Sequence, residues 1–185
     1  QTVQVQATAA VQLQTTSAQV GNVMGGSEMM KLPTLQHNAT ELVSLQPGVQ
    51  PGNGSFPTPD VRSAGAMDDQ NTYTLDGIDI SDNLVGNGTW LPVPLDSVQE
   101  FDIGVADPNS TFGRSSGAQI AMVARHGTNQ YHGAVYWYHQ NDQLNANTWE
   151  NNRAGIPRTE LKDNRGGFRL GGPIWKGKTF FFANY

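Results

Sequence analysis

Apolar and polar residues alternate over short and changing periods along this chain, and most of these periods predict β-strands. Residues 1–14 alternate apolar with polar side chains, as in Val3-Gln4-Val5, which is typical of a strand. Residues 15–30 are small and polar and predict a loop or a frayed helix. An extended segment followed by a less regular stretch is therefore expected at this end of the sequence.

Two short helices are predicted from capping signals. Asn38 is a favourable N-cap with Glu41 three residues later, and Pro47-Gly48 ends the apolar stretch that follows. Pro94 to Phe101 has a proline at its start, an acidic residue in its first turn and three apolar residues on one helical face. Both segments are expected to be helices of about two turns.

Three further segments predict strands separated by turns. Val61–Ser63 is short and β-branched at its start, and Tyr73–Ile80 carries a turn near Asp76-Gly77. Gly117–Ala124 is a mostly apolar strand candidate. Residues 46–60 hold four prolines and three glycines and are expected to be an irregular loop.

The character of the sequence changes after Gly127. Residues 131–139, 166–175 and 179–185 are aromatic and strand-like. A polar, loop-like stretch separates the first two segments, and the turn Lys176-Gly177-Lys178 separates the last two. An isolated hairpin this aromatic would aggregate in water. We therefore expect the chain to be a fragment, or its strands to be completed by further sequence.

Composition narrows the class of protein. Only 15% of the residues are charged, glycine is abundant and no residue is cysteine. This composition excludes a coiled coil, and it excludes cysteine-based zinc sites and thiol catalysis within the chain. Residues 1–110 carry twelve acidic and two basic side chains, whereas residues 111–185 carry four acidic and nine basic ones. The first part repels nucleic acid and the basic residues of the second part are scattered, so no nucleic-acid partner is expected.

One segment matches a nucleotide-binding pattern. Residues 172–179 read GPIWKGKT and fit the phosphate-binding pattern GxxxxGK[ST]. The chemistry needs free backbone N–H groups and a following helix, but Pro173 removes one N–H group and Phe180 to Phe182 predict a strand. A hairpin turn is therefore favoured over a nucleotide site.

No catalytic or metal-binding constellation is evident. Asp76, Asp79 and Asp82 recur every three residues, which does not fit a calcium loop, and capping of turns is the favoured role. His132 and His139 fall on opposite faces of one strand, so they are not a metal pair. We predict no enzyme activity, no cofactor and no metal.

Eight short segments together resemble a known family. In order along the chain they are Lys31–Pro33, Leu42–Val49, Leu75–Ile78, Val98–Phe101, Phe112–Gly117, Gly127–Gly133, Gly171–Ile174 and Lys178–Phe182. This ordered set resembles TonB-dependent outer-membrane receptors of bacteria. The subgroup it most resembles carries a carboxypeptidase-regulatory-like domain ahead of the plug domain.

The resemblance implies an α+β fold with two parts. Residues 8–127 would form a small plug domain with a mixed sheet and short helices. Residues 128–185 would form the first antiparallel strands of a 22-stranded outer-membrane β-barrel, whose other strands would lie beyond this sequence. The plug would close the barrel and open it for energy-coupled uptake of a ligand, which could be a siderophore, a glycan or a peptide.

The resemblance also implies a site for the periplasmic protein TonB. Residues 1–7 look like the family's TonB box, with Gln1 in place of the usual acidic residue and the matching stretch formed by Thr2, Val3, Gln4, Val5, Gln6 and Ala7. Such a segment would add as an edge strand to the C-terminal domain of TonB. An ordinary first strand of the plug is the alternative.

The remaining expectations concern the ligand side and the partners. The loops 46–60 and 83–94 are expected to face the ligand through Asn53, Phe56, Asn87 and Trp90. The expected partners are TonB, the rest of the barrel, outer-membrane lipid and an unidentified small ligand. The alternative function is a soluble or surface β-rich binding module that forms part of a larger complex.

Overall fold

The computed structural model describes residues 20–34, 36–51, 61–82, 88–106 and 116–185. It forms two compact units, of which unit 1 ends at Val123 and unit 2 runs from Ala124 to Tyr185. The predicted strand over residues 1–14 lies outside the described residues. The predicted division into segments 1–7, 8–127 and 128–185 stays a prediction.

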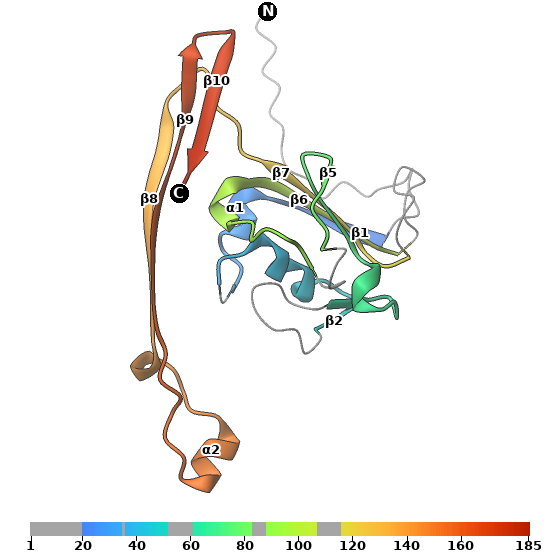
Figure 1. Ribbon diagram of the computed structural model, residues 1–185, viewed down its shortest axis with the longest axis vertical. Helices are drawn as coiled ribbons and strands as arrows, with labels where there is room; N and C mark the ends of the chain where they lie inside the picture. Colours follow the sequence, from blue (N-terminus) through green and yellow to red (C-terminus); the bar gives the residue numbers. More distant parts are fainter. Residues whose placement is uncertain (1–19, 35, 52–60, 83–87, 107–115) are drawn as a thin grey trace, which may run out of the picture. The chain divides into compact units, whose positions relative to one another are not determined.

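Unit 1 contains a five-stranded mixed sheet (Figure 1). Its strands, in spatial order, are β1 (Val20–Gly25), β6 (Val98–Ala106), β7 (Gln119–Ala124), β4 (Thr72–Leu75) and β5 (Ile78–Asp79). β1 pairs antiparallel with β6, β4 pairs antiparallel with β5, and β4 pairs parallel with β7. Both parallel and antiparallel neighbours are present, as an α+β fold with a mixed sheet requires.

Short helical segments and a small hairpin complete unit 1. They are α1 (Gly26–Met29), the 3₁₀ helices η1 (Ala39–Leu45), η2 (Asp68–Gln70) and η3 (Leu95–Ser97), and the antiparallel pair β2 (Val49–Pro51) and β3 (Val61–Ser63). The tight turn predicted at Asp76-Gly77 is confirmed, because it joins β4 to β5 and both residues have positive φ angles.

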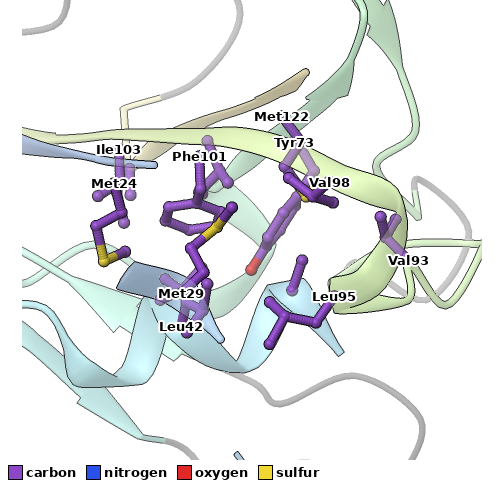
Figure 2. Packing of buried hydrophobic residues seen from close by; sticks show 14 of the residues in the cluster. Met24, Met29, Leu42, Tyr73, Val93, Leu95, Val98, Phe101, Ile103 and Met122 are labelled. Carbon is purple, nitrogen blue, oxygen red and sulfur yellow. The ribbon is translucent and has the colours of Figure 1, made fainter. Parts of the chain in front are cut away.

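The core of unit 1 lies between the sheet and the helical segments. Phe101 and Ile103 are fully buried, and Figure 2 shows them pointing from β6 toward Met29 of α1 and Leu42 of η1, which are fully buried as well. Tyr73 of β4 adds the largest ring on the same side of the sheet. Burial of these large apolar side chains stabilises the unit.

The cap predicted at Asn38 is confirmed. Asn38 Oδ1 accepts a hydrogen bond from Thr40 N at 3.2 Å at the start of η1. The Glu41 carboxylate accepts from Gln36 N at 3.0 Å, so it fixes the entering chain rather than the cap residue itself. The segment is a 3₁₀ helix rather than an α-helix.

The helix predicted from Pro94 to Phe101 is wrong. Only Leu95–Ser97 is helical, and β6 begins at Val98. The three-residue spacing from Val98 to Phe101 mimics a helical face, but the strand continues with alternating burial at Phe101, Ile103 and Val105. Pairing with β1, which is distant in sequence, overrides the local pattern.

The loop or frayed helix predicted over residues 15–30 is also wrong for the part that is described. Val20–Gly25 is the edge strand β1, and only Gly26–Met29 is helical. β1 was missed because Gly21, Asn22 and Gly25 have low intrinsic strand preference, so its conformation depends on the backbone bonds to β6.

Unit 2 is a three-stranded antiparallel sheet with the order β10-β9-β8. β8 (His132–Asn141), β9 (Lys162–Trp175) and β10 (Thr179–Asn184) confirm the three predicted aromatic strands. Figure 1 shows β8 and β9 side by side over their length, in register from His132 opposite Gly171 to Asn141 opposite Lys162.

The polar stretch between β8 and β9 is more ordered than a plain loop. It contains a 3₁₀ turn, η4 (Asp142–Leu144), and the helix α2 (Trp149–Ala154). Thr148 Oγ1 caps α2 by accepting from Asn151 N, and Gly155 ends it in the left-handed conformation. The sequence carries local signals for this helix, namely a Thr N-cap, Glu150 in the first turn and a terminal glycine.

The segment that fits the nucleotide-binding pattern is a hairpin. Gly172 to Trp175 end β9, Gly177 turns the chain with φ +73°, and Thr179 begins β10. This result confirms the predicted hairpin, because no helix follows the glycine-containing turn.

The helices that the structure describes are all too short to span a membrane.

Candidate functional site

Most of the predicted site residues lie outside the part of the chain that the structure describes. These are the TonB-box-like residues Thr2, Val3, Gln4, Val5, Gln6 and Ala7, and the predicted ligand contacts Asn53, Phe56 and Asn87. Trp90 is described, and its side chain is 60% exposed. Its backbone N–H donates to Ile80 O at 3.1 Å, so the backbone is fixed while the ring remains accessible.

β1 is an edge strand with little side-chain packing. Of its 6 residues only Met24 is buried, and among the described residues the strand pairs on one side alone, with β6. Val23, opposite Asp102 in the register, is 48% exposed. An edge strand that buries one side chain has fewer interactions to lose than the central strands when it is displaced.

Gln46 is the main side-chain anchor of β1 outside the sheet. It is buried at the end of η1, and its Nε2 donates to Leu42 O at 3.3 Å and to Met24 Sδ at 3.7 Å. Its Oε1 accepts from Asn22 Nδ2 at 3.2 Å. Gln46 therefore links β1 to the helical layer by contacts with two of its residues.

A buried polar cluster joins residues of unit 1 that are distant in the sequence. Asn71 Nδ2 donates to Val61 O at 2.6 Å, and Asn71 Oδ1 accepts from Ser63 Oγ at 2.6 Å. Ala118 N lies 2.6 Å from Ser63 Oγ and 2.9 Å from Asn71 Oδ1, and it donates to both. Val61 directly follows the segment 52–60, and Ala118 lies three residues after the segment 107–115. Asn71 therefore bonds to a residue that follows each of the two segments.

Neighbouring backbone bonds strengthen the same junction. Gly117 N donates to Gln70 O at 2.9 Å, and Thr72 N donates to Ala118 O at 2.9 Å. A Cβ atom on Gly117 would lie 2.6 Å from Gln70 O, so the close approach of these two backbone segments requires glycine at this position. β4 and β7 start side by side here, in the parallel register that pairs Thr72 with Gln119.

The segment 83–87 is closed at its base next to the same strand. Ser81 and Thr89 form an isolated antiparallel bridge, and Asp82 N donates to Gly88 O at 3.0 Å. Ser81 Oγ accepts from Tyr73 N at 2.9 Å. Residues that follow the segments 52–60 and 107–115, and Ser81 before the segment 83–87, are therefore bonded to residues 70–73 at the start of β4.

Two carboxylate side chains lie on the face of β6 that points away from the core, in the part of the strand that pairs with β1. Glu100 is opposite Gly25 and Asp102 is opposite Val23, two residues apart on one strand. Partial burial, and to a smaller extent the negative charge of Glu100, raise the pKa of Asp102 above its ordinary value. The carboxylate of Asp102 is thus less favourable in the folded unit than in water.

Unit 2 has two faces of different chemistry. On one face Val135 is opposite Phe168 and Trp137 is opposite Gly166, and the exposed fractions are 88% for Val135 and 69% for Trp137. On the other face Tyr136 Oη donates to Asn184 Oδ1 at 2.9 Å, and Arg165 forms an ion pair with Asp163. An apolar face and a polar face that alternate along each strand are the pattern of an outer-membrane β-barrel.

Among the described residues Thr128 Oγ1 lies 3.4 Å from His132 Nδ1, but this hydroxyl is exposed and donates to Gln130 O at 3.0 Å. The polar clusters consist of amides, hydroxyls and backbone groups, which position loops rather than perform acid–base chemistry. The aspartates interpreted as turn caps include Asp79, whose Oδ1 accepts from Ser81 N at 2.9 Å. This contact supports the capping role over a metal site.

Comparison with known proteins agrees with the barrel-like pattern of apolar and polar faces in unit 2. A family model described as an outer membrane beta barrel domain matches residues 123–185. The TonB-dependent transporter Oar of Myxococcus xanthus is 32% identical over 148 residues, which are 78% of this chain and 13% of that protein. The chain thus spans about an eighth of the length of this curated relative.

Solved structures show the same fold. The siderophore receptor PirA of Acinetobacter baumannii matches 89% of this chain and 24% of its own, with a TM-score of 0.67 and 18% identity. YddB, an outer membrane transporter of Escherichia coli, matches 82% of this chain and 24% of its own, with a TM-score of 0.62 and 17% identity. At these sequence identities the two matches show similarity of the fold alone.

A plug-like mixed sheet followed by antiparallel strands with one apolar face defines a plugged outer-membrane barrel protein. The chain belongs to the TonB-dependent outer-membrane receptor family, and its place is the bacterial outer membrane. The relatives are transporters and receptors. These findings favour a receptor over a soluble or surface binding module. Membership of the subgroup with an additional N-terminal domain stays a prediction.

The sequence interpretation missed the residues that hold the structure around the predicted site. Gln46, Ser63 and Asn71 are polar residues next to strands or helices, and nothing in their local pattern marks them as buried. Only Asn71, two residues before the predicted strand Tyr73–Ile80, stands where a capping side chain is common. Their partners are distant in sequence, so they become visible only in the fold.

Proposed function

We propose that this chain is the gating part of an energy-coupled importer of the outer membrane. Unit 1 would close the pore of a barrel that begins with β8, β9 and β10 and is completed by further strands of the same receptor. Outer-membrane lipid would surround the apolar face of unit 2. The protein would act as a transporter and not as an enzyme.

The coupling would begin at residues 1–7. Thr2 to Ala7 would add as an edge strand to the C-terminal domain of TonB, because backbone N–H and C=O groups of an extended segment can bond to any exposed sheet edge. Force applied there would reach β1 as the first strand of unit 1. The observation that carries this proposal is that β1 is an edge strand with one buried side chain, Met24.

The ligand side would be formed by the segments whose bases meet at residues 70–73. Asn53, Phe56, Asn87 and Trp90 would contact the ligand, and the junction around Asn71 would carry its effect to β4 and β7. The chemical class of the ligand stays open, with a siderophore, a glycan and a peptide as candidates. Siderophore receptors are among the structural relatives, but that ligand class is known for those proteins and not for this chain.

Binding of the purified C-terminal domain of TonB to the full receptor tests the coupling. In a strand pairing, alternate residues bond to the partner, so one of two neighbouring positions must supply bonded groups. We expect either Gln4→Pro or Val5→Pro to weaken binding at least about tenfold, because proline removes a backbone N–H and fits poorly within a ladder. The matched variants Gln4→Ala and Val5→Ala should change affinity less than about threefold, since their backbones are intact.

Two results would contradict the proposal. Unchanged affinity in both proline variants would exclude strand addition at residues 1–7. Equal losses in the proline and alanine variants would show that side chains, rather than the backbone, are recognised. Hydrogen exchange of the β1 amides, measured in each variant, shows whether the plug itself is unperturbed.

A further inference from the structure

The two ends of the three-stranded sheet of unit 2 differ in charge. All residues from 124 to 185 are described, and the acidic ones among them are Asp142, Glu150, Glu160 and Asp163. All four lie at the end of the sheet that carries α2. The basic residues Lys162 and Arg165 at that end form ion pairs with Glu160 and Asp163.

The opposite end, around the turn between β9 and β10, has basic residues but no acidic one. Lys176 and Lys178 flank the turn residue Gly177, and both side chains are exposed. Gly177 N donates to Asn129 Oδ1 at 2.7 Å, which ties the turn to the segment that leads into β8. The two lysines are therefore held a short distance apart on an ordered turn.

Exposed apolar and aromatic side chains border the same turn. Tyr131, Ile174 and Trp175 are each 69% exposed. Tyr131 Oη donates to Pro173 O at 3.0 Å, and Lys178 Nζ lies 5.6 Å from the centre of the Trp175 ring. Aromatic rings with a polar end, together with lysines, are typical of the level where the hydrocarbon core meets the headgroups.

The length of the strands places the turn at this level. β8 has 10 residues, which span about 33 Å at ~3.3 Å per residue. Tilted as barrel strands are, this length covers an apolar band of roughly 25 Å. With Val135, Trp137 and Phe168 in the hydrocarbon, Lys176 and Lys178 lie beside the phosphates of one leaflet. Short turns of such barrels face the periplasm, where that leaflet consists of phospholipid.

We propose that the turn between β9 and β10 is a binding site for an anionic phospholipid. Lys176 and Lys178 would contact the headgroup phosphate, and Ile174, which alternation places on the same face of β9 as Phe168, would lie against the upper acyl chains. The segment that fits a nucleotide pattern would thus bind phosphate, but as a lipid headgroup at a membrane surface. Arg125 precedes β8 at this end, but it is half-buried and has partners within the protein, so the contact is assigned to the two lysines.

This proposal rests on the outer-membrane location and is independent of coupling to TonB. The full receptor in detergent is titrated with dioleoylphosphatidylglycerol, and bound lipid is counted by native mass spectrometry. We expect roughly tenfold weaker lipid binding in Lys176→Gln/Lys178→Gln, because each lysine contributes to attraction of an anionic lipid. The matched control at the other end, Arg153→Gln/Lys162→Gln, should bind as the unchanged receptor does.

Further measurements distinguish the effect of charge from an effect on folding, and binding of phosphatidylglycerol from binding of other lipids. Lys176→Arg/Lys178→Arg keeps the charge and should retain binding, and 0.5 M salt should weaken binding to the unchanged receptor. Equal affinity of the glutamine variant and the unchanged receptor would overturn the proposal. Loss confined to the control variant, or tighter binding of lipid A than of phosphatidylglycerol, would overturn it as well. If the glutamine variant does not assemble, the salt titration of the unchanged receptor decides alone.

Discussion

The indole ring of Trp137 on β8 occupies the space above Gly166 on β9. The two residues are directly opposite in the antiparallel register, and a Cβ atom on Gly166 would lie 2.6 Å from Trp137 Cε3. Tyr136 and Gly167 repeat the arrangement on the other face, where the same construction brings a Cβ atom 2.5 Å from Tyr136 Oη. Each large ring covers a glycine of the next strand. Gly166 is required by the Trp137 ring, whereas a Cβ atom on Gly167 would come closer still to the backbone oxygen of Tyr185, at 2.1 Å.

A methyl group at Gly166 is therefore expected to destabilise unit 2. Gly166→Ala should cost about 1–3 kcal/mol, because the Trp137 ring must leave its position or the strands must separate. The measurement is denaturant unfolding of the full receptor in lipid vesicles. Gly25→Ala is the matched control, since a Cβ atom on Gly25 meets nothing within 4 Å.

A double-mutant cycle shows whether the ring is the cause. If Trp137 is what the new methyl group meets, Trp137→Ala/Gly166→Ala should be less destabilised than the sum of its single changes. Additive effects would mean that Gly166 is needed for its backbone alone.

Asn71 is expected to be the most sensitive position of the loop junction. Asn71→Ala removes the donor to Val61 O and the acceptor shared by Ser63 Oγ and Ala118 N, all of which are buried. We expect a loss of about 2–3 kcal/mol in the stability of unit 1, because buried groups are left without a partner. Hydrogen exchange at Ala118 and Thr72 should accelerate first.

The exposed residue Gln50 gives the control for this experiment. Gln50→Ala lies on the neighbouring strand β2 and should leave exchange at Ala118 unchanged. Exchange that accelerates equally in both variants would exclude Asn71 as the residue that joins the two loops.

Protonation of Asp102 is expected to strengthen the pairing of β1 with β6. Its pKa is raised in the folded chain, so the folded state binds more protons than the unfolded state above the ordinary value of 3.8. The contribution of Asp102 to the free energy of unfolding is therefore most favourable below pH 3.8, and it decreases as the pH rises through the raised pKa. Exchange protection of the β1 and β6 amides, corrected for the intrinsic rate, should decrease from pH 4.5 to pH 7.

Asp102→Asn provides the comparison for the pH series. The variant keeps a side chain of similar shape without the charge, so protection should be higher at pH 7 and should vary less with pH. A variant that retains the full pH dependence would exclude Asp102 as its source.

The sequence predicted those parts of the fold that depend on local signals. Asp76-Gly77 and Lys176-Gly177-Lys178 are tight turns because glycine adopts positive φ there, and the strands on either side were found with them. The three aromatic strands of unit 2 were found from their composition. Helix α2 carried an equally local signal in Thr148 and Gly155, and it could have been predicted.

Features that depend on distant partners could not be predicted. β1 is a strand because β6 pairs with it, and β6 itself was predicted to start as a helix because its first apolar residues are three apart. The junction at Asn71 joins residues 8 to 55 positions apart, which no local pattern reveals. Among the predicted site residues only Trp90 has a described environment, so the others stay predictions.

The release of β1 under load is the most direct test of the proposed gate. Val23 and Asp102 are opposite one another, and directly opposed residues of antiparallel strands lie within the range that a disulfide spans. Because the 185 residues contain no cysteine, Val23→Cys/Asp102→Cys introduces one defined cross-link in this part of the receptor. The full receptor is held in a membrane and pulled from residue 1 with a force probe.

We expect a first rupture at low force in the unchanged receptor, in the Asp102→Cys control and in the reduced double variant. In the oxidised double variant this rupture should be absent, since β1 is then bonded to β6. Identical force traces in the oxidised and reduced double variants would contradict the proposal that β1 is the strand through which the plug is opened.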